Sequence, residues 1–216
     1  MKPIIYSQRW DADSRLSAFG LTVDILQKPV RVGHLGLVSC TDNDPPFVRG
    51  FTAWAHTLRS LRELLIPLGW KRDNSANYAR TFSDKHCINI IVASGDAATG
   101  CGHLAPKTKS PKGTRAENSV VGNAQGLLAG FLPDLNQEEG LTPDSSGYPT
   151  WIFLVFITEA AVRAELSFPI TIKAGNIESW RERILLPDIA VGPDDSLDLT
   201  LADLGPDFPV DVRRKA

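Results

Sequence analysis

The segment from Val162 to Lys173 constrains the fold most strongly, because apolar and polar side chains alternate along it. Such alternation predicts a β-strand with one face toward a core and the other toward solvent. The apolar positions are Val162, Ala164, Leu166, Phe168, Ile170 and Ile172, and the polar positions are Arg163, Glu165, Ser167, Thr171 and Lys173. Pro169 predicts a sheet edge or a β-bulge here, because proline lacks the N–H group that a central ladder requires.

Three further strands are predicted, and the four strands together form two hairpins. An apolar run at 151–157 precedes the alternating segment and pairs with it across a turn. Residues 78–82 and 86–93 form the second hairpin around a turn at 83–85. Both faces of 86–93 are apolar, which favours a central strand. The sequence therefore predicts an antiparallel sheet of about four strands.

Helical periodicity is clearest after Asp44, which is predicted to cap a long amphipathic helix that ends before Pro67. Its apolar stripe comprises Phe47, Phe51, Trp54, Leu58, Leu61 and Leu65. Weaker patterns predict a helix at 14–27 that ends at Pro29, followed by irregular chain at 29–46. A further helix is predicted at 118–132. The segment 177–186 is predicted to be a short helix, with a further strand as the alternative. Segregated helices and sequential strands indicate an α+β fold, with the long helix on one face of the sheet and a loop insertion at 95–150.

Length and charge narrow the class of protein. The 216 residues suffice for one domain, predicted at 1–192, and 193–216 is predicted to be an acidic peripheral segment. A formal charge of −2 and a pI near 6.1 disfavour a nucleic-acid binder that is basic all over, but they allow a local basic patch.

Three cysteines do not form a disulfide framework, so we interpret them as reduced thiols of a cytoplasmic protein, with Cys87 buried and Cys101 exposed. The first 15 residues lack the apolar core of a signal peptide. The longest apolar run falls well short of the roughly 20 residues that a membrane helix needs, so no membrane association is predicted.

The loop after the strand at 86–93 carries the most conspicuous polar chemistry. Lys107, Lys109, Lys112 and Arg115 alternate there with hydroxyl side chains, a pattern that suits contact with a row of phosphates. The polar face of the long helix adds Arg49 and Arg59. These six residues are the predicted binding residues. The simpler alternative is that both the loop and the helix face are only solvated.

Three familiar sites are disfavoured in the same loop. Gly95 and Gly100 have the spacing of a phosphate-binding P-loop, but Cys101-Gly102 stands where Lys and Ser or Thr are required. Cys101 and His103 are too close together for an ordinary zinc knuckle, even with His86 and Cys87 nearby. No motif of a serine nucleophile is present. No cofactor is therefore expected.

Asp96 and Glu165 support a rival interpretation, in which both carboxylates hold a metal ion in a phosphoesterase or nuclease. The lysine that nucleases place two residues after such a glutamate is replaced by Ser167. The leading prediction is therefore a non-enzymatic binding protein that uses the basic loop against a nucleic acid, a nucleoprotein or a protein. A metal-dependent phosphoesterase and a structural subunit of an assembly remain as alternatives. A further hypothesis is that the acidic segment 193–216 covers the basic loop of the same molecule.

Overall fold

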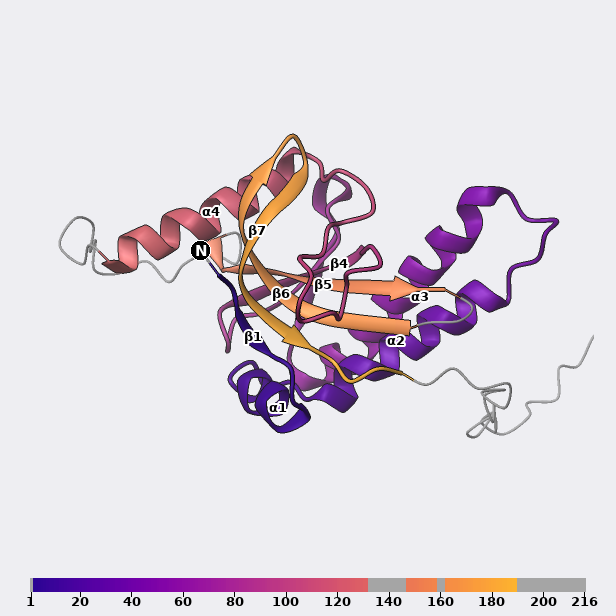
Figure 1. Cartoon of the computed structure of the whole chain (residues 1–216), viewed down its shortest axis with the longest axis horizontal. Coiled ribbons are helices and arrows are strands. Elements are labelled where there is room, and N and C mark those ends of the chain that lie inside the picture. The colour runs from indigo at the N-terminus through magenta and orange to yellow at the C-terminus, as the bar shows by residue number, and fades with distance from the viewer. Residues whose placement is uncertain (1, 132–146, 159–161, 190–216) are drawn as a thin grey trace, which may run out of the picture.

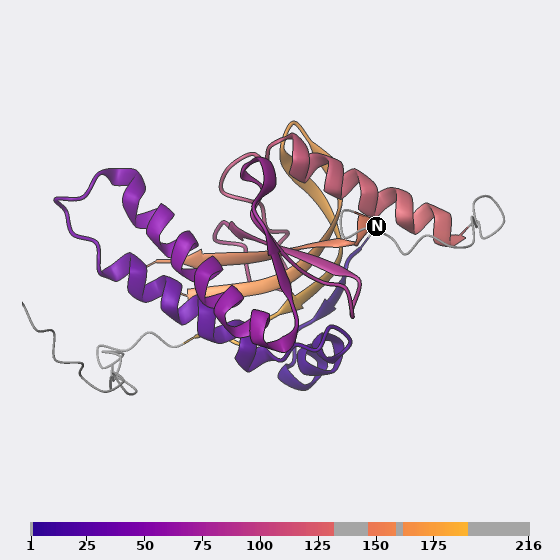
Figure 2. The same cartoon turned by 180° about the vertical axis from the view of Figure 1, so that it is seen from behind.

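A seven-stranded mixed sheet carries helices on both of its faces (Figures 1 and 2). The computed structural model describes residues 2–131, 147–158 and 162–189. The strands are β1 (Ile4–Tyr6), β2 (Lys71–Asp73), β3 (Arg80–Ser83), β4 (Ile88–Ser94), β5 (Thr150–Ile157), β6 (Val162–Lys173) and β7 (Asn176–Leu185), in the spatial order β1-β7-β6-β5-β4-β3-β2. The helices are α1 (Arg9–Ser17), α2 (Val23–Val38), α3 (Pro46–Leu65) and α4 (Thr114–Phe131), with short 3₁₀ turns at Ile66–Leu68 and Ser75–Asn77.

The prediction of an antiparallel sheet of about four strands is wrong, although the α+β class broadly fits. Both predicted hairpins form, as β3/β4 and β5/β6. They are joined by parallel pairing of β4 with β5, which the connection through α4 makes geometrically accessible. β1 pairs in parallel with β7 at one edge, and β2 extends the other. Both edge strands have three residues, which is too short for periodicity to reveal them.

The preferred prediction of a helix at 177–186 is also wrong, because this segment is strand β7. Ile177 and Trp180 are three residues apart and nevertheless pack in the same cluster. The register with β6 shifts here, so that Ser179 and Ile177 pair with adjacent β6 residues and Glu178 is an extra residue. Such a bulge restores to one face two side chains that a regular strand would place on opposite faces. The bulge therefore produced a spacing that resembled a helix.

The part of β6 from Ala164 to Pro169 is buried on both faces, whereas its polar positions were predicted to face solvent. Thr171 and Lys173, near the end of the strand, are exposed as predicted. Glu165 and Ser167 are fully buried. The strand lies between β5 and β7, and the loop after β4 covers its second face. The predicted bulge at Pro169 is confirmed by the register shifts on either side of it, but the alternative of a sheet edge is wrong.

Helices α1 and α2 replace the predicted helix at 14–27 and the predicted irregular chain at 29–46. Gly20 adopts φ 67° and separates the two helices, and the hydroxyl of Thr22 caps α2 by accepting from the Ile25 N–H at 3.2 Å. Pro29 lies inside α2 and does not end it. The α2 residues Val23, Leu26 and Val30 are fully buried in the main core, and this packing offsets the hydrogen bond that Pro29 cannot make.

The long helix is confirmed as α3, and Gly69 with φ 88° ends the 3₁₀ turn that follows it. Its predicted cap is wrong, because the Asp44 carboxylate accepts from the Thr41 N–H at 2.7 Å and Pro45 occupies the cap position. Figure 1 shows that α2 and α3 run together beyond the ends of the strands. The first part of α3 therefore extends past the edge of the sheet formed by the strand ends.

The two faces of the sheet bury separate clusters. Alternate residues of β4 and β5 pack with α1, α2 and α3 on one face, and the remaining ones pack with α4 on the other. This double burial confirms the prediction that 86–93 contains a central strand. The helix predicted at 118–132 is also confirmed, because α4 covers all but the last of these positions.

The predicted placement of two cysteines is wrong. Cys87, predicted to be buried, is exposed in a turn with φ 48°, and Cys101, predicted to be exposed, is half-buried. The acidic segment 193–216 lies outside the described residues. None of the described helices is long and apolar enough to span a membrane.

Candidate functional site

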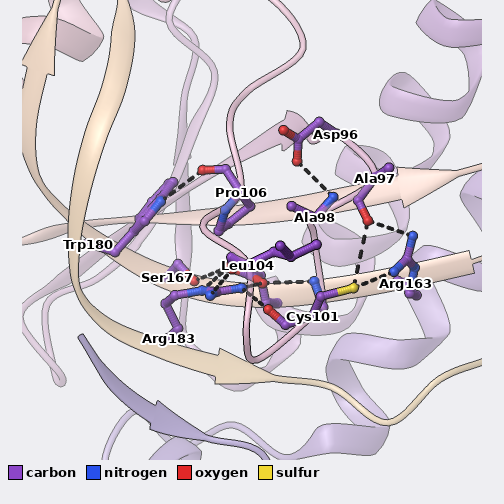
Figure 3. Close-up of polar contacts among 12 residues, drawn as sticks. Asp96, Ala97, Ala98, Cys101, Leu104, Pro106, Arg163, Ser167, Trp180 and Arg183 are labelled. Carbon is purple, nitrogen blue, oxygen red and sulfur yellow. Dashed lines mark hydrogen bonds and ion pairs between the residues drawn. The ribbon is translucent and has the colours of Figure 1, made fainter. Parts of the chain in front are cut away.

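A buried ion pair anchors the loop that follows β4. The Arg183 Nη2 atom donates to the Glu165 carboxylate at 2.6 Å, and both side chains are at most 2% exposed. Arg183 also donates to the carbonyl oxygens of Leu104 at 2.6 Å and Cys101 at 3.1 Å (Figure 3). The Gly100 N–H donates to the Glu165 carboxylate at 2.8 Å. The pair thus satisfies the polar groups of the loop backbone, and removing either partner would leave a buried charge uncompensated.

The second half of the loop is attached to the sheet by backbone pairing. The Lys109 N–H donates to the Ser94 carbonyl at 2.8 Å, and the Asp96 N–H donates to the Lys107 carbonyl at 3.1 Å. Trp180 holds the middle of the loop by donating from its indole nitrogen to the Pro106 carbonyl at 3.0 Å (Figure 3). The segment 107–109 therefore continues the sheet beside the end of β4, which defines the backbone positions of Lys107 and Lys109.

A groove of about 980 Å³ opens where this segment meets α3. We call it the α3 groove. It is lined by Phe47, Arg49, Phe51 and Trp54 of α3, by Ser94, Gly95 and Asp96 at the end of β4, by Lys109 and Ser110, and by Val155, Phe156, Ile157 and Thr158 at the end of β5, with Leu37, Pro46, Gly50 and Ala53 completing it. The groove thus lies at the carboxyl ends of the parallel strands β4 and β5, where sheets of this kind commonly bind ligands.

Aromatic side chains form much of the helix side of the α3 groove. Phe47 is 73% exposed and Phe51 is 59% exposed. The ring centroids of Phe51 and Trp54 are 5.8 Å apart. Trp54 is fixed to the sheet, because its indole nitrogen donates to the Val92 carbonyl at 3.0 Å. The helix side of the α3 groove therefore combines one anchored aromatic ring with two that are largely exposed.

Three charged residues also line the α3 groove, and all three were singled out from the sequence. Arg49 comes from α3, Lys109 from the loop and Asp96 from the end of β4. The Asp96 carboxylate accepts from the Ala98 N–H at 3.1 Å (Figure 3). The structure thus brings two predicted binding residues and one predicted metal ligand to a single groove.

The other four predicted binding residues lie elsewhere. Lys107 is exposed on the loop outside the α3 groove, and Arg115 is exposed in the first turn of α4. The Lys112 N–H donates to the Gly175 carbonyl in the β6–β7 turn, and burial lowers the pKa of the Lys112 ammonium. Arg59 lies outside the α3 groove, and its Nε atom is 3.9 Å from the Glu63 carboxylate. The six predicted binding residues therefore do not form one row of cations.

The two predicted metal ligands do not share a site. Both oxygens of Glu165 accept hydrogen bonds, from Ser167 and Arg183 and from the Gly100 N–H, beneath the loop. Asp96 lines the open α3 groove instead. Within 2–131, 147–158 and 162–189, no three His, Cys, Asp or Glu side chains cluster as a metal site would require.

The residues considered for zinc are also separated. The His86 ring stacks on Trp70 with the centroids 6.4 Å apart. The Cys101 sulfur lies 2.6 Å from the Arg163 guanidinium. These neighbours are an aromatic ring and a cation, neither of which is a metal ligand.

Sequence reasoning missed the aromatic part of the site and its support. Phe47 and Phe51 were placed on the apolar stripe of a helix that packs on the sheet, although Phe47 directly follows Pro45-Pro46 at the start of α3. Arg183 was missed because its segment was interpreted as a helix. A buried partner for Glu165 carries no local sequence signal, since the two residues are 18 positions apart.

Comparison with protein-family models, with curated proteins and with solved structures found no match. The geometry and chemistry of the α3 groove are therefore the basis for assigning a function.

Proposed function

We propose that this is a binding protein whose α3 groove receives a protein segment that carries both apolar and acidic side chains. The observation that supports this most is the exposure of Phe47 and Phe51 beside two cations of the same groove, Arg49 and Lys109. Clustered exposed apolar side chains on a folded domain commonly mark an interaction site. Aromatic residues and arginine are also the residue types that most often dominate the binding energy of protein interfaces.

Burial of the two phenylalanines would contribute part of the binding energy. Burying a large apolar side chain contributes about 1.5–3 kcal/mol, so two phenylalanines give a few kcal/mol before the polar contacts are counted. Arg49 and Lys109 would then orient an acidic residue of the partner. Asp96 would disfavour a partner segment that places a carboxylate next to the Asp96 side chain. The basic-loop prediction is thereby narrowed from four loop cations to Lys109 acting with Arg49.

A single-stranded nucleic acid is the second candidate, because bases stack on aromatic rings while cations hold the backbone. Two features favour a protein segment instead. Asp96 places a negative charge in the α3 groove, and Lys112 and Arg115 lie outside it. A nucleic acid would therefore meet two cations rather than a continuous basic track.

Selection of displayed peptides against the full-length protein tests the proposal. A library of random 12-residue peptides is selected on the wild type and counter-selected on Phe51→Ser. We expect enrichment of peptides that combine Leu, Phe or Trp with Asp or Glu, and loss of their binding to Phe51→Ser. Enriched peptides that bind both proteins equally would contradict the proposal.

The nucleic-acid candidate is tested by fluorescence anisotropy with a labelled oligonucleotide of 20 thymidines. Lys109→Glu is compared with Lys107→Glu, a matched control because Lys107 is exposed on the same loop outside the α3 groove. Weak binding is expected for the wild type and for both variants. Salt-dependent binding that only Lys109→Glu abolishes would favour nucleic acid over a protein segment.

A further inference from the structure

We propose that the α3 groove binds residues 197–204 of the same molecule, so that the protein carries an internal competitor for its own binding site. This inference rests on the proposed function and identifies one occupant of the α3 groove. Residues 197–204 lie outside the described residues. Three features point to them: their sequence, the side chains that line the α3 groove, and the place where the described chain ends.

The sequence of this segment complements the chemistry of the α3 groove. It reads LDLTLADL, in which Leu197, Leu199 and Leu201 occupy every second position and Leu204 follows. Asp198 and Asp203 lie within it, and Asp194 and Asp195 precede it. Lysine and arginine are absent from 190–212. The leucines suit Phe47 and Phe51, and the aspartates suit Arg49 and Lys109, so both kinds of contact required by the proposed function are present in one short segment.

The described chain ends at the same end of the sheet as the α3 groove. Ile189, the last described residue, forms an antiparallel bridge with Val162. Val162 in turn pairs with Ile157, which lines the α3 groove. Neighbouring strands are about 4.8 Å apart, so Ile189 lies within roughly 10 Å of Ile157. Ile189 also packs in the core cluster between the sheet and α1, α2 and α3, which places it on the same face of the sheet as α3.

The connecting chain is long enough to reach the α3 groove. Residues 190–196 span up to about 24 Å when fully extended, at roughly 3.4 Å per residue. The gap from Ile189 to the rim of the groove at Ile157 is less than half of this. A segment tethered at such a distance has an effective concentration in the millimolar range, so even weak contacts would keep the groove largely occupied.

Intramolecular occupancy has a consequence for external partners. An added segment would have to displace residues 197–204, so its apparent affinity would be lower than the intrinsic affinity of the α3 groove. Replacing Leu197, Leu199 and Leu201 with serine would remove the competitor and leave every described residue unchanged. This triple-serine variant is expected to bind peptides selected for the groove about tenfold or more tightly than the wild type does, because three leucine contacts are lost from the competitor.

Site-specific photo-crosslinking in the full-length protein tests the inference directly. The photoreactive residue p-benzoylphenylalanine replaces Phe51 in one protein and Trp10 in a control, since Trp10 is exposed on α1 outside the α3 groove. Crosslinked peptides are mapped by mass spectrometry. We expect position 51, but not position 10, to crosslink to residues 197–204 of the same chain, with about a tenfold lower yield in the triple-serine variant. Crosslinks from position 51 only to other segments, or an unchanged yield in the triple-serine variant, would overturn the inference.

Two controls separate this inference from the proposed function. Mixing isotopically heavy and light protein distinguishes crosslinks within one chain from crosslinks between two copies, and crosslinks between copies alone would overturn the intramolecular assignment. Peptide selection is repeated on the triple-serine variant. If peptides that require Phe51 are still enriched while no crosslink to 197–204 forms, the inference fails and the proposed function stands. If no peptide that requires Phe51 is enriched and no crosslink to 197–204 forms, both the inference and the proposed function fail.

Discussion

The two halves of α3 carry the same apolar stripe but meet different surroundings. In the second half Leu61 and Leu65 are fully buried against the sheet and α2. In the first half Phe47 and Phe51 are largely exposed, because the helix continues past the ends of the strands. Helical periodicity therefore shows which residues share a face, but it does not show whether that face is covered by the same molecule. An uncovered extension of a core stripe is a natural place for a partner to bind.

Trp54 marks the boundary between the two halves. Its ring packs against the main core and also lines the α3 groove, while its indole nitrogen is bonded to Val92. On the buried side, Arg62 fastens the helix to the sheet by donating to the Arg80 carbonyl at 3.0 Å, and burial lowers the pKa of its guanidinium. The second half of α3 is thus attached by both packing and hydrogen bonds.

The largest effect is expected for Leu61→Ala in the buried half. The substitution removes a fully buried side chain and leaves a cavity, which costs about 2–5 kcal/mol of the free energy of unfolding. Urea denaturation followed by circular dichroism measures this loss. A loss below about 1 kcal/mol would show that the second half of α3 is not core, and the contrast between the two halves would disappear.

An intermediate effect is expected for Trp54→Phe at the boundary. The substitution keeps an aromatic ring but removes the hydrogen bond to the Val92 carbonyl, which contributes about 0.5–1.5 kcal/mol. The same denaturation experiment detects it. A free energy of unfolding equal to that of the wild type would mean that this hydrogen bond does not fix Trp54 to the sheet.

A smaller effect, confined to acidic solution, is expected beside the buried half. Hydrogen bonds from Ser75, with a further contribution from Arg80, hold the pKa of Asp73 at about 2, below its ordinary value of 3.8. A depressed pKa stabilises the folded state above the ordinary value, and this stabilisation is lost as the pH falls from about 4 toward 2. Asp73→Asn should therefore lose less stability than the wild type over this interval in a series of urea denaturations. Identical losses would contradict the assignment.

The smallest change in stability is expected for Phe47→Ser and Phe51→Ser in the exposed half. Both side chains are mostly in solvent, so each substitution should alter the free energy of unfolding by no more than about 0.5 kcal/mol. Urea denaturation of each variant, alongside Leu61→Ala, provides the comparison. A loss of 2 kcal/mol or more from either substitution would place its phenylalanine in the core and remove the basis for the α3 groove as a binding surface.

The parts of the fold that could be predicted are those with an uninterrupted local pattern. The strands β4, β5 and β6 and the helix α3 fall at their predicted positions. The errors arise where a single residue or a distant contact decides the outcome. Pro29 is tolerated within α2 by its packing, and the extra residue Glu178 gives β7 a spacing like that of a helix. The parallel pairing of β4 with β5 depends on a crossover, which no local pattern encodes.

The candidate site was only partly predictable for the same reason. Composition drew attention to Lys109 and Asp96, and the structure brings both to one groove with Arg49. Charge alone could not separate Lys109 from Lys107, because only the backbone pairing beside β4 determines which lysine lines the groove. Glu165 was expected to face solvent, and its burial followed from a partner on β7 that was itself misassigned.

The central claim is that the first half of α3 is a binding surface for an acidic segment that contains leucines. The most direct measurement is the affinity of a fluorescein-labelled peptide with the sequence of residues 193–204 for the full-length triple-serine variant, by fluorescence anisotropy. We predict saturable binding that Phe51→Ser weakens by about tenfold or more, as expected for the loss of one buried aromatic contact. Equal affinity with and without Phe51, or no saturable binding, would contradict the claim.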